Sequence, residues 1–502
     1  MNGLKRRDLL KGTAALTVAG PILKFAGSTA AAALPGPQWI FFGPDPTAGL
    51  IVNWSSGSAS SVTAAPPAPQ VRYGLTAAYG RVQPATAAKV PVPAGHGEPA
   101  QDTWYLSAAL TGLLPGTVYH YSVSNDGHTW TPDAPFTTAA VSGGFRFTAF
   151  GDEAAAAARA TPMAQLAASL SPAFHLVAGD LAYATPDPMK LPNVTGYNPA
   201  QWDAYLKAVG PAAARSVPWQ ASVGAHEIEP LVSPGYAGFT TRFPYLADRT
   251  SGSPVVRAFT YSNAAFIHLD GNDLSAQETV NTGYTAGAQT TWLAAKLAGY
   301  RAAGSGIDFI VIIVNCSCYS SNAEHGSDGG LRDVWGPLFD QYQVDLVISG
   351  HVHAYERTHP MIAGQPTSQV PSGGTVNSAS QGTTYICAGG GGNGLYGQWY
   401  GTTLGGDAGS TTAPKVWRWS GGDTALGGTG TARDVTDTAV GYSAYRQAAY
   451  HCLCVDVVPA ASDGPPSMLI RALKPAQTAS AVTSITSPAV MDSVNIIRTG
   501  GA

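Results

Sequence analysis

Gly350-His-Val-His-Ala-Tyr-Glu-Arg357 is the stretch that decides the fold, because it follows the apolar run Val344-Asp-Leu-Val-Ile-Ser349. Alternate positions at a strand end can project two imidazoles, those of His351 and His353, toward neighbouring ions. Four other apolar runs also end in a residue that can bind a metal: Asp152, Asp180, His226 and Asn315. Buried strands open their carboxyl ends into a common crevice. The runs therefore predict that Asp, Tyr and His side chains converge on a site for hard or borderline cations.

The chain is long enough for several domains, since 502 residues at about 150 per domain predict two to four. Residues 37–140 contain short alternating runs separated by turn residues, which predicts a β-sandwich. From residue 145 to about 475, apolar runs alternate with helical stretches, which is typical of a layered α/β domain. Within it, we expect the Gly-, Ser- and Thr-rich segment 361–445 to be an insertion or lid, and residues 476–502 to form a polar C-terminal tail.

The first 33 residues predict an export signal. Lys-Arg-Arg-Asp-Leu-Leu-Lys at 5–11 precedes an apolar stretch at 12–25 and a run of small residues at 28–33. The Arg6-Arg7 pair resembles a twin-arginine signal, so we expect a soluble periplasmic or extracellular protein with no membrane span.

Net charge disfavours polyanionic partners. Residues 1–33 carry five basic side chains and one acidic one, a sum of +4, so removing them takes the formal charge from −4 to −8. We therefore expect neither a nucleic acid nor an anionic membrane as a partner. The five cysteines are predicted to be buried structural residues, and the sequence leaves the oligomeric state open.

Four motifs resemble the purple acid phosphatases of the calcineurin-like metallophosphoesterases: Gly151-Asp152, Gly179-Asp-Leu-Ala-Tyr183, His226-Glu227 and Gly350–Arg357. Leu110–Tyr119 also resembles a passage of fibronectin type III domains, and Gln289–Leu293 the family's mid-domain helix. The resemblance spans residues 37 to 475. It implies an α+β multidomain fold in which a fibronectin III-like sandwich precedes an α/β metallophosphoesterase domain, with two packed mixed sheets flanked by helices.

The resemblance also implies ligands and roles. Asp152, Tyr183 and His353 would bind a first ion, ferric in the family, and Asp180 would bridge it to a second, divalent one. The second ion, Zn, Mn or Fe, would also take His351 and two further strand-end residues. In the family, paired ions hold a phosphate ester, lower the pKa of a bound water and stabilise the attacking and departing oxygens. His226 and His325 match the outer histidines that orient the ester and protonate the leaving group.

The match breaks at the second ion. The family's strand-end Asn is Ala225 here, which cannot coordinate, and its strand-end His is Asn315, a weaker ligand for transition ions. The first site thus keeps all its ligands and the second keeps two of four. Three interpretations stay open: a single-ion enzyme, a second site rebuilt by Glu153, Glu227 or Cys316, or a domain that has lost hydrolysis and binds a ligand.

The sequence therefore predicts an exported phosphoesterase that hydrolyses phosphate monoesters or diesters by a metal-bound hydroxide, with an acidic to neutral optimum. Iron is expected at one strong site, with a weaker second divalent ion. The alternative is a catalytically weak or inactive phosphatase-like binding protein that retains one ion. A mononuclear iron enzyme of other chemistry is a third reading, which a tyrosinate ligand would permit.

Overall fold

The computed structural model describes residues 34–56, 65–89, 103–186, 188, 197–229, 234–245, 248–401, 403–407, 412–413, 416–419, 433–437, 441–461 and 464–499. The predicted signal at 1–33 lies outside these residues, as does much of 408–440. None of the helices in the described part of the chain has the length and apolar character that crossing a bilayer requires.

The N-terminal strands form two antiparallel four-stranded sheets. One has the order β1 (Gln38–Phe42), β2 (Gly49–Ser55), β6 (Trp104–Thr111), β5 (Thr86–Lys89). The other has the order β4 (Arg81–Pro84), β3 (Gln70–Gly74), β7 (Val118–Ser124), β8 (Ala134–Thr137). Large apolar side chains from both sheets, including Trp54 and Tyr121, are buried in one cluster. The predicted β-sandwich is confirmed; its likeness to fibronectin type III domains stays a prediction.

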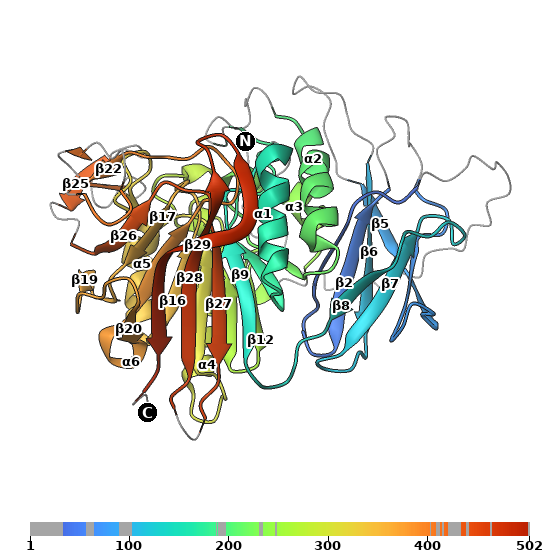
Figure 1. The fold of residues 1–502 in the computed structure, drawn as a ribbon, viewed down its shortest axis with the longest axis horizontal. Helices are drawn as coiled ribbons and strands as arrows, with labels where there is room; N and C mark the ends of the chain where they lie inside the picture. The colour runs from blue at the N-terminus through green and yellow to red at the C-terminus, as the bar shows by residue number, and fades with distance from the viewer. Residues whose placement is uncertain are drawn as a thin grey trace, which may run out of the picture. The chain divides into compact units, whose positions relative to one another are not determined.

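Two mixed seven-stranded sheets follow (Figure 1). The first has the order β11 (Trp219–Ala221), β10 (Phe174–Val177), β9 (Phe145–Phe150), β27 (Cys452–Val458), β28 (Ser467–Gln477), β29 (Val482–Ile497), β20 (Gly374–Asn377). The second has the order β12 (Arg257–Tyr261), β13 (Ala264–His268), β14 (Phe309–Val314), β16 (Leu346–Ser349), β21 (Thr384–Ala388), β17 (Tyr355–Thr358), β26 (Ser443–Gln447). Within them, β11, β10 and β9 are parallel, and so are β13, β14, β16 and β21.

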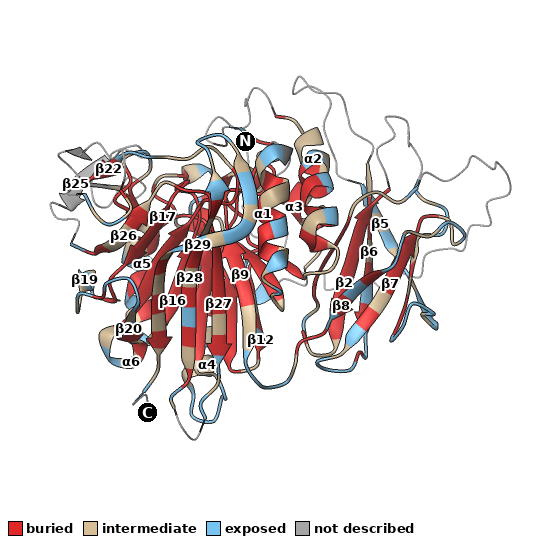
Figure 2. Ribbon diagram, in the orientation of Figure 1, coloured by how far each residue is buried: buried red, intermediate tan, exposed pale blue. Residues whose placement is uncertain are grey.

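The two sheets bury their facing sides together, with Phe147 and Leu176 in the same cluster as Val311 and Ile348. Helices α1 (Ala157–Ser169) and α2 (Ala200–Val209) cover the other side of the first sheet. Helices α4 (Ala288–Arg301) and α5 (Gly329–Gln341) cover the second. Strands covered on both sides read as continuous apolar runs, and Figure 2 shows them buried along their length. The predicted layered domain is confirmed.

The predicted C-terminal tail is wrong. Residues 476–502 include all of β29, which pairs antiparallel with β28 and sets Val494 opposite Ile470. Its end alternates buried Val494 and Ile496 with less buried neighbours, the pattern of a strand with one face toward solvent. That two-residue period was the signal for a strand that the polar composition obscured.

The Gly-rich segment 361–445 contributes β20 and β21 to the two large sheets. Its other described strands are short: β18 (Met361–Ile362), β19 (Gln365–Pro366), β22 (Trp399–Tyr400), β23 (Thr412–Ala413), β24 (Val416–Trp419) and β25 (Arg433–Asp437). The insertion boundaries stay a prediction. All five cysteines are buried and unpaired with one another, as expected.

Candidate metal centre

Tight turns at the strand ends carry the predicted site residues. Four of these residues have left-handed backbone with positive φ: Asp152 at 60°, Asp180 at 56°, Tyr183 at 54° and His351 at 67°. A non-glycine residue pays roughly 1–3 kcal/mol for a sparsely populated conformation of this kind, and such strain concentrates at functional sites. The strand ends thus hold these side chains where relaxed turns would not place them.

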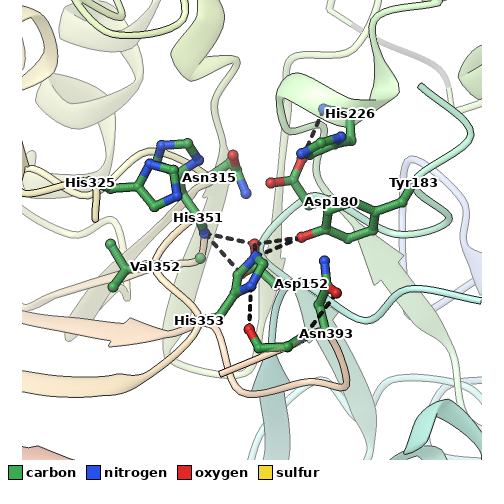
Figure 3. A network of polar contacts seen from close by, with 12 residues as sticks. Asp152, Asp180, Tyr183, His226, Asn315, His325, His351, Val352, His353 and Asn393 are labelled. Carbon is green, nitrogen blue, oxygen red and sulfur yellow. Dashed lines mark hydrogen bonds and ion pairs between the residues drawn. The ribbon is translucent and has the colours of Figure 1, made fainter. Parts of the chain in front are cut away.

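Asp152, Tyr183 and His353, here called the first donor set, meet around one point (Figure 3). The Tyr183 hydroxyl lies 3.2 Å from Asp152 Oδ1 and 2.9 Å from His353 Nε2, and that nitrogen lies 3.5 Å from Asp152 Oδ1. Neighbouring ligands of an ion with bonds of about 2.0–2.2 Å are roughly 3 Å apart. The three donor atoms therefore have the spacing that one small cation requires.

The surrounding chain fixes the first donor set. The backbone N–H of His351 donates to both carboxylate oxygens of Asp152, at 3.0 and 2.8 Å. His353 Nδ1 lies 2.6 Å from the carbonyl oxygen of Gly394, which can only accept, so Nδ1 carries the proton and Nε2 presents its lone pair. The ring of Tyr396 stacks on His353 at 4.2 Å. Neither Gly394 nor Tyr396 was singled out from the sequence.

The glycine run 389–392, directly after β21, packs against the Asp152 loop. A Cβ on Gly389 would lie 2.8 Å from Asp152 Oδ2, and one on Gly391 would lie 2.3 Å from the Gly151 carbonyl oxygen. Only glycine permits so close a backbone approach. Consecutive glycines directly after a buried strand were the signal that could have marked this loop as part of the site.

Burial shifts the ionisable groups of the first donor set away from their charged forms. It raises the pKa of Asp152 well above its usual range, and the nearby charge of Asp180 raises it further. Burial and the same carboxylates raise the pKa of Tyr183, and burial lowers the pKa of His353 to about 4. Two neighbouring buried carboxylates can both ionise only if a positive charge lies nearby. A bound cation would provide that charge and lower the pKa values of the carboxyl and phenol groups. The residues present fit a cation on this ground.

Asp180, His351 and Asn315, the second donor set, lie beside the first. The Asn315 amide donates through Nδ2 to the Ala178 carbonyl at 2.9 Å, while its Oδ1 is buried and has no hydrogen-bond partner among the described residues. A Cβ on Gly224 would lie 2.3 Å from Asp180 Oδ1 and 2.7 Å from Asn315 Cγ, so carboxylate and amide converge there. An orphaned buried acceptor next to a carboxylate suits a cation.

The second donor set is short of ligands. Ala225, at the start of the short helix η3 (Ala225–Glu227), is buried and offers only a methyl group. Glu227 is occupied, because both its oxygens accept backbone N–H groups, from Asp180 and Leu181 at 2.8 Å and from Gly224 at 2.7 Å. It holds the strand-end turns together, so its carboxylate is not available to replace the missing ligand.

The other proposed replacements are also held elsewhere. Glu153 Oε1 accepts a hydrogen bond from the Tyr205 hydroxyl at 3.0 Å, and Cys316 Sγ contacts Ser275 Oγ at 3.7 Å. Burial raises the pKa of both side chains, that of Glu153 to about 8. Glu153 Oε2 is buried without a hydrogen-bond partner, but among the described residues neither side chain has a hydrogen bond to the second donor set. Nor do three His, Cys, Asp or Glu side chains of this part of the chain converge closely enough to hold an ion, so the site depends on Tyr183 and Asn315.

His226 and His325 flank the donor sets, on opposite sides in Figure 3. The His226 backbone N–H donates to Asp180 Oδ1 at 2.9 Å, and its ring lies 4.1 Å from that of Tyr183. The ring of His325 lies 4.0 Å from that of His351. Both outer histidines are half-buried, whereas the carboxylates beneath them are fully buried. They therefore stand between the donor sets and solvent.

Comparison with known proteins agrees with this fold. Residues 40–138 match the family model for the N-terminal domain of purple acid phosphatases. The purple acid phosphatase PPD1 from yellow lupin has the same fold, with a TM-score of 0.64 at 19% identity over 92% of this chain and 74% of that one. The chain is therefore similar to the purple acid phosphatases, by sequence in its N-terminal domain and by its fold.

Sequence relatives cover only part of each chain. An uncharacterised protein of Mycobacterium tuberculosis is 33% identical over 317 residues, which is 57% of this chain and 57% of its own length. Purple acid phosphatase 1 of Ipomoea batatas is 28% identical over 43% of each chain. The phosphoenolpyruvate phosphatase of Allium cepa is 30% identical over 37% of this chain and 36% of its own. The purple acid phosphatase relationship thus rests on part of each relative's length.

Proposed function

We propose that this protein is a metal-dependent phosphoesterase that hydrolyses phosphate esters, with one strong ion site. The observation that carries the proposal is the mutual spacing of 2.9–3.5 Å between donor atoms of Asp152, Tyr183 and His353. Similarity to the purple acid phosphatases supports phosphate esters as the substrate class and iron as the first ion. A bound cation supplies Lewis acidity toward the ester and its attacking water.

The site residues would have separate roles in binding the ions and in transferring protons. The first donor set holds the first cation, Asp180 lies between the two positions, and His351 with Asn315 offers a weaker second position for Zn, Mn or Fe. His226 Nδ1 lies 2.5 Å from the Thr185 carbonyl oxygen, so it carries a proton there and leaves Nε2 to face the ester. His325, on the other side, delivers the proton that the departing oxygen requires.

The test is hydrolysis of 4-nitrophenyl phosphate by wild type and by the His325→Ala and His226→Ala variants. Each variant should lose about 10²–10⁴-fold in kcat, the usual worth of a positioned proton donor. His128→Ala, on the surface of the sandwich, is the matched control and should leave the rate unchanged. Equal rates in all four proteins would mean that these histidines do not serve hydrolysis.

One observation favours the alternative of a catalytically weak binding protein that retains one ion. Ala225 and Asn315 leave the second position with fewer strong ligands, and the nearby carboxylate of Glu227 is engaged by backbone. The two functions diverge in turnover: a binding protein retains the first ion and binds phosphate without hydrolysing the ester, whereas the enzyme turns over and is stopped by removing the ion with a chelator.

We also propose export by the twin-arginine route to the periplasm or outside the cell. Replacing Arg6 and Arg7 by Lys keeps the charge of the segment and removes the guanidinium pair. The variant should stay in the cytoplasm, as cell fractionation would show. Export undiminished by the double change would rule this route out.

A further inference from the structure

Gln277, a side chain that no motif marked, bridges His351 of the second donor set and the outer histidine His325. Its Nε2 lies 2.6 Å from His325 Nδ1, and its Oε1 lies 3.0 Å from His351 Nε2. The same two imidazole rings are 4.0 Å apart. One amide therefore contacts both a proposed ion ligand and the proposed proton donor.

The two ends of an amide have opposite hydrogen-bonding character. The NH₂ group only donates and the carbonyl oxygen only accepts, whereas a neutral imidazole carries one proton on either nitrogen. Contact with the NH₂ group requires a bare Nδ1 on His325 and so puts its proton on Nε2. Contact with the oxygen requires a proton on Nε2 of His351 and so leaves Nδ1 bare.

We propose that Gln277 is a positioning residue that sets the tautomers of His325 and His351 together. This inference rests on the proposed function for its purpose: it leaves His351 Nδ1 as the nitrogen for a cation and His325 Nε2–H as the donor toward the departing oxygen. An amide turned the other way would reverse both tautomers at once, protonating the nitrogen needed by the ion and stripping the one needed by the ester.

The deciding measurement is made on the metal-free protein with ¹⁵N-labelled histidine, by two-bond ¹H–¹⁵N correlation spectra that distinguish the tautomers. His325→Gln and His351→Gln, each removing one set of signals, assign the rings. Wild type should show both protons on Nε2. Gln277→Glu, whose carboxylate only accepts, should move the His325 proton to Nδ1 and leave His351 unchanged. Val280→Ala, an exposed position on the same loop, should change neither ring.

A His325 proton on Nδ1 in wild type, or an unchanged His325 spectrum in Gln277→Glu, would overturn the inference. Hydrolysis of 4-nitrophenyl phosphate gives a second readout: Gln277→Glu should lower kcat about 10–100-fold, the usual effect of a partner that orients a functional residue, with KM nearly unchanged. The two proposals fail separately. Expected tautomers in a protein without hydrolytic activity would sink the proposed function and leave the positioning role standing.

Discussion

The two donor sets have the same kind of backbone conformation but different side-chain chemistry. Asp152 of the first and Asp180 and His351 of the second all lie in strand-end turns with positive φ. Yet the first set brings three strong donors together, while the second contains the amide of Asn315 and the methyl group of Ala225 lies where a ligand is expected. The difference shows that strand-end turns with the same backbone conformation can present unlike side chains at neighbouring positions.

The severest test of this contrast is Asp152→Asn. The carboxylate anchors Tyr183 and the His351 backbone, and without its charge the first cation loses its main electrostatic partner. We expect metal affinity to fall by at least about 100-fold, beyond the 10–100-fold typical of a residue that only supports a ligand. Metal analysis of purified protein measures it, with Asp133→Asn on the sandwich surface as the control. Full metal content in Asp152→Asn would mean that the ion, if any, binds elsewhere.

Tyr183→Phe addresses the ligand that distinguishes the first set. Burial raises the pKa of this phenol, so only a strongly Lewis-acidic cation would stabilise the phenolate. Loss of the oxygen should remove any tyrosinate-to-iron absorption in the visible range and weaken binding about 10–100-fold. Tyr396→Phe is the matched control, because that ring stacks on His353 and should leave the absorption in place. A visible band that survives Tyr183→Phe would assign the ligand to another tyrosine.

Giving the second donor set the two ligands that the family resemblance implies should make its metal affinity more like that of the first. Wild type is expected to hold one ion tightly, and Ala225→Asn combined with Asn315→His should add a second and raise turnover of 4-nitrophenyl phosphate about tenfold or more. Metal counting and steady-state kinetics measure the two effects. Two ions at full occupancy in wild type, or a slower restored variant, would contradict the account of Ala225 and Asn315.

Asp270, a buried carboxylate outside both donor sets, gives a reference for them that does not depend on a metal. Asp270 accepts hydrogen bonds from the Tyr236 and Tyr284 hydroxyls, at 3.0 and 2.7 Å, and burial raises its pKa to about 6 from 3.8. Between these two pKa values Asp270 binds more protons in the folded state than in the unfolded state. Its contribution to the free energy of unfolding is therefore largest below pH 4 and is lost as the pH rises through 6.

The free energy of unfolding loses roughly 3 kcal/mol at most from Asp270 as the pH rises, by conversion of the difference between its two pKa values. Asp270→Asn should flatten this part of the curve of unfolding free energy against pH, measured by chemical denaturation of the metal-free protein between pH 4 and 7. An unchanged slope would mean that another group carries the pH dependence.

Much of the fold was predictable because its signals are local. The period-two runs of the sandwich and the continuous apolar runs of β9, β10, β14 and β16 follow from which faces each strand buries. The β29 strand was missed because its outward residues are polar and its partner β28 is known only from the fold. The donor sets were predictable as strand-end residues, but Gly394, Tyr396 and Gln277 were not, since each contacts the site from a loop distant in sequence.

The sequence by itself determined which chemical groups stand at the strand ends, including Ala225 and Asn315 where the resemblance to purple acid phosphatases implies an amide and an imidazole. Only the tertiary structure decided which atoms meet. It gives the three donors of the first set the spacing that a single cation requires. It also engages both oxygens of Glu227 with backbone N–H groups and places one glutamine in contact with two histidines. Residue type fixes what a side chain can bind, whereas burial and the convergence of remote loops fix what it does bind.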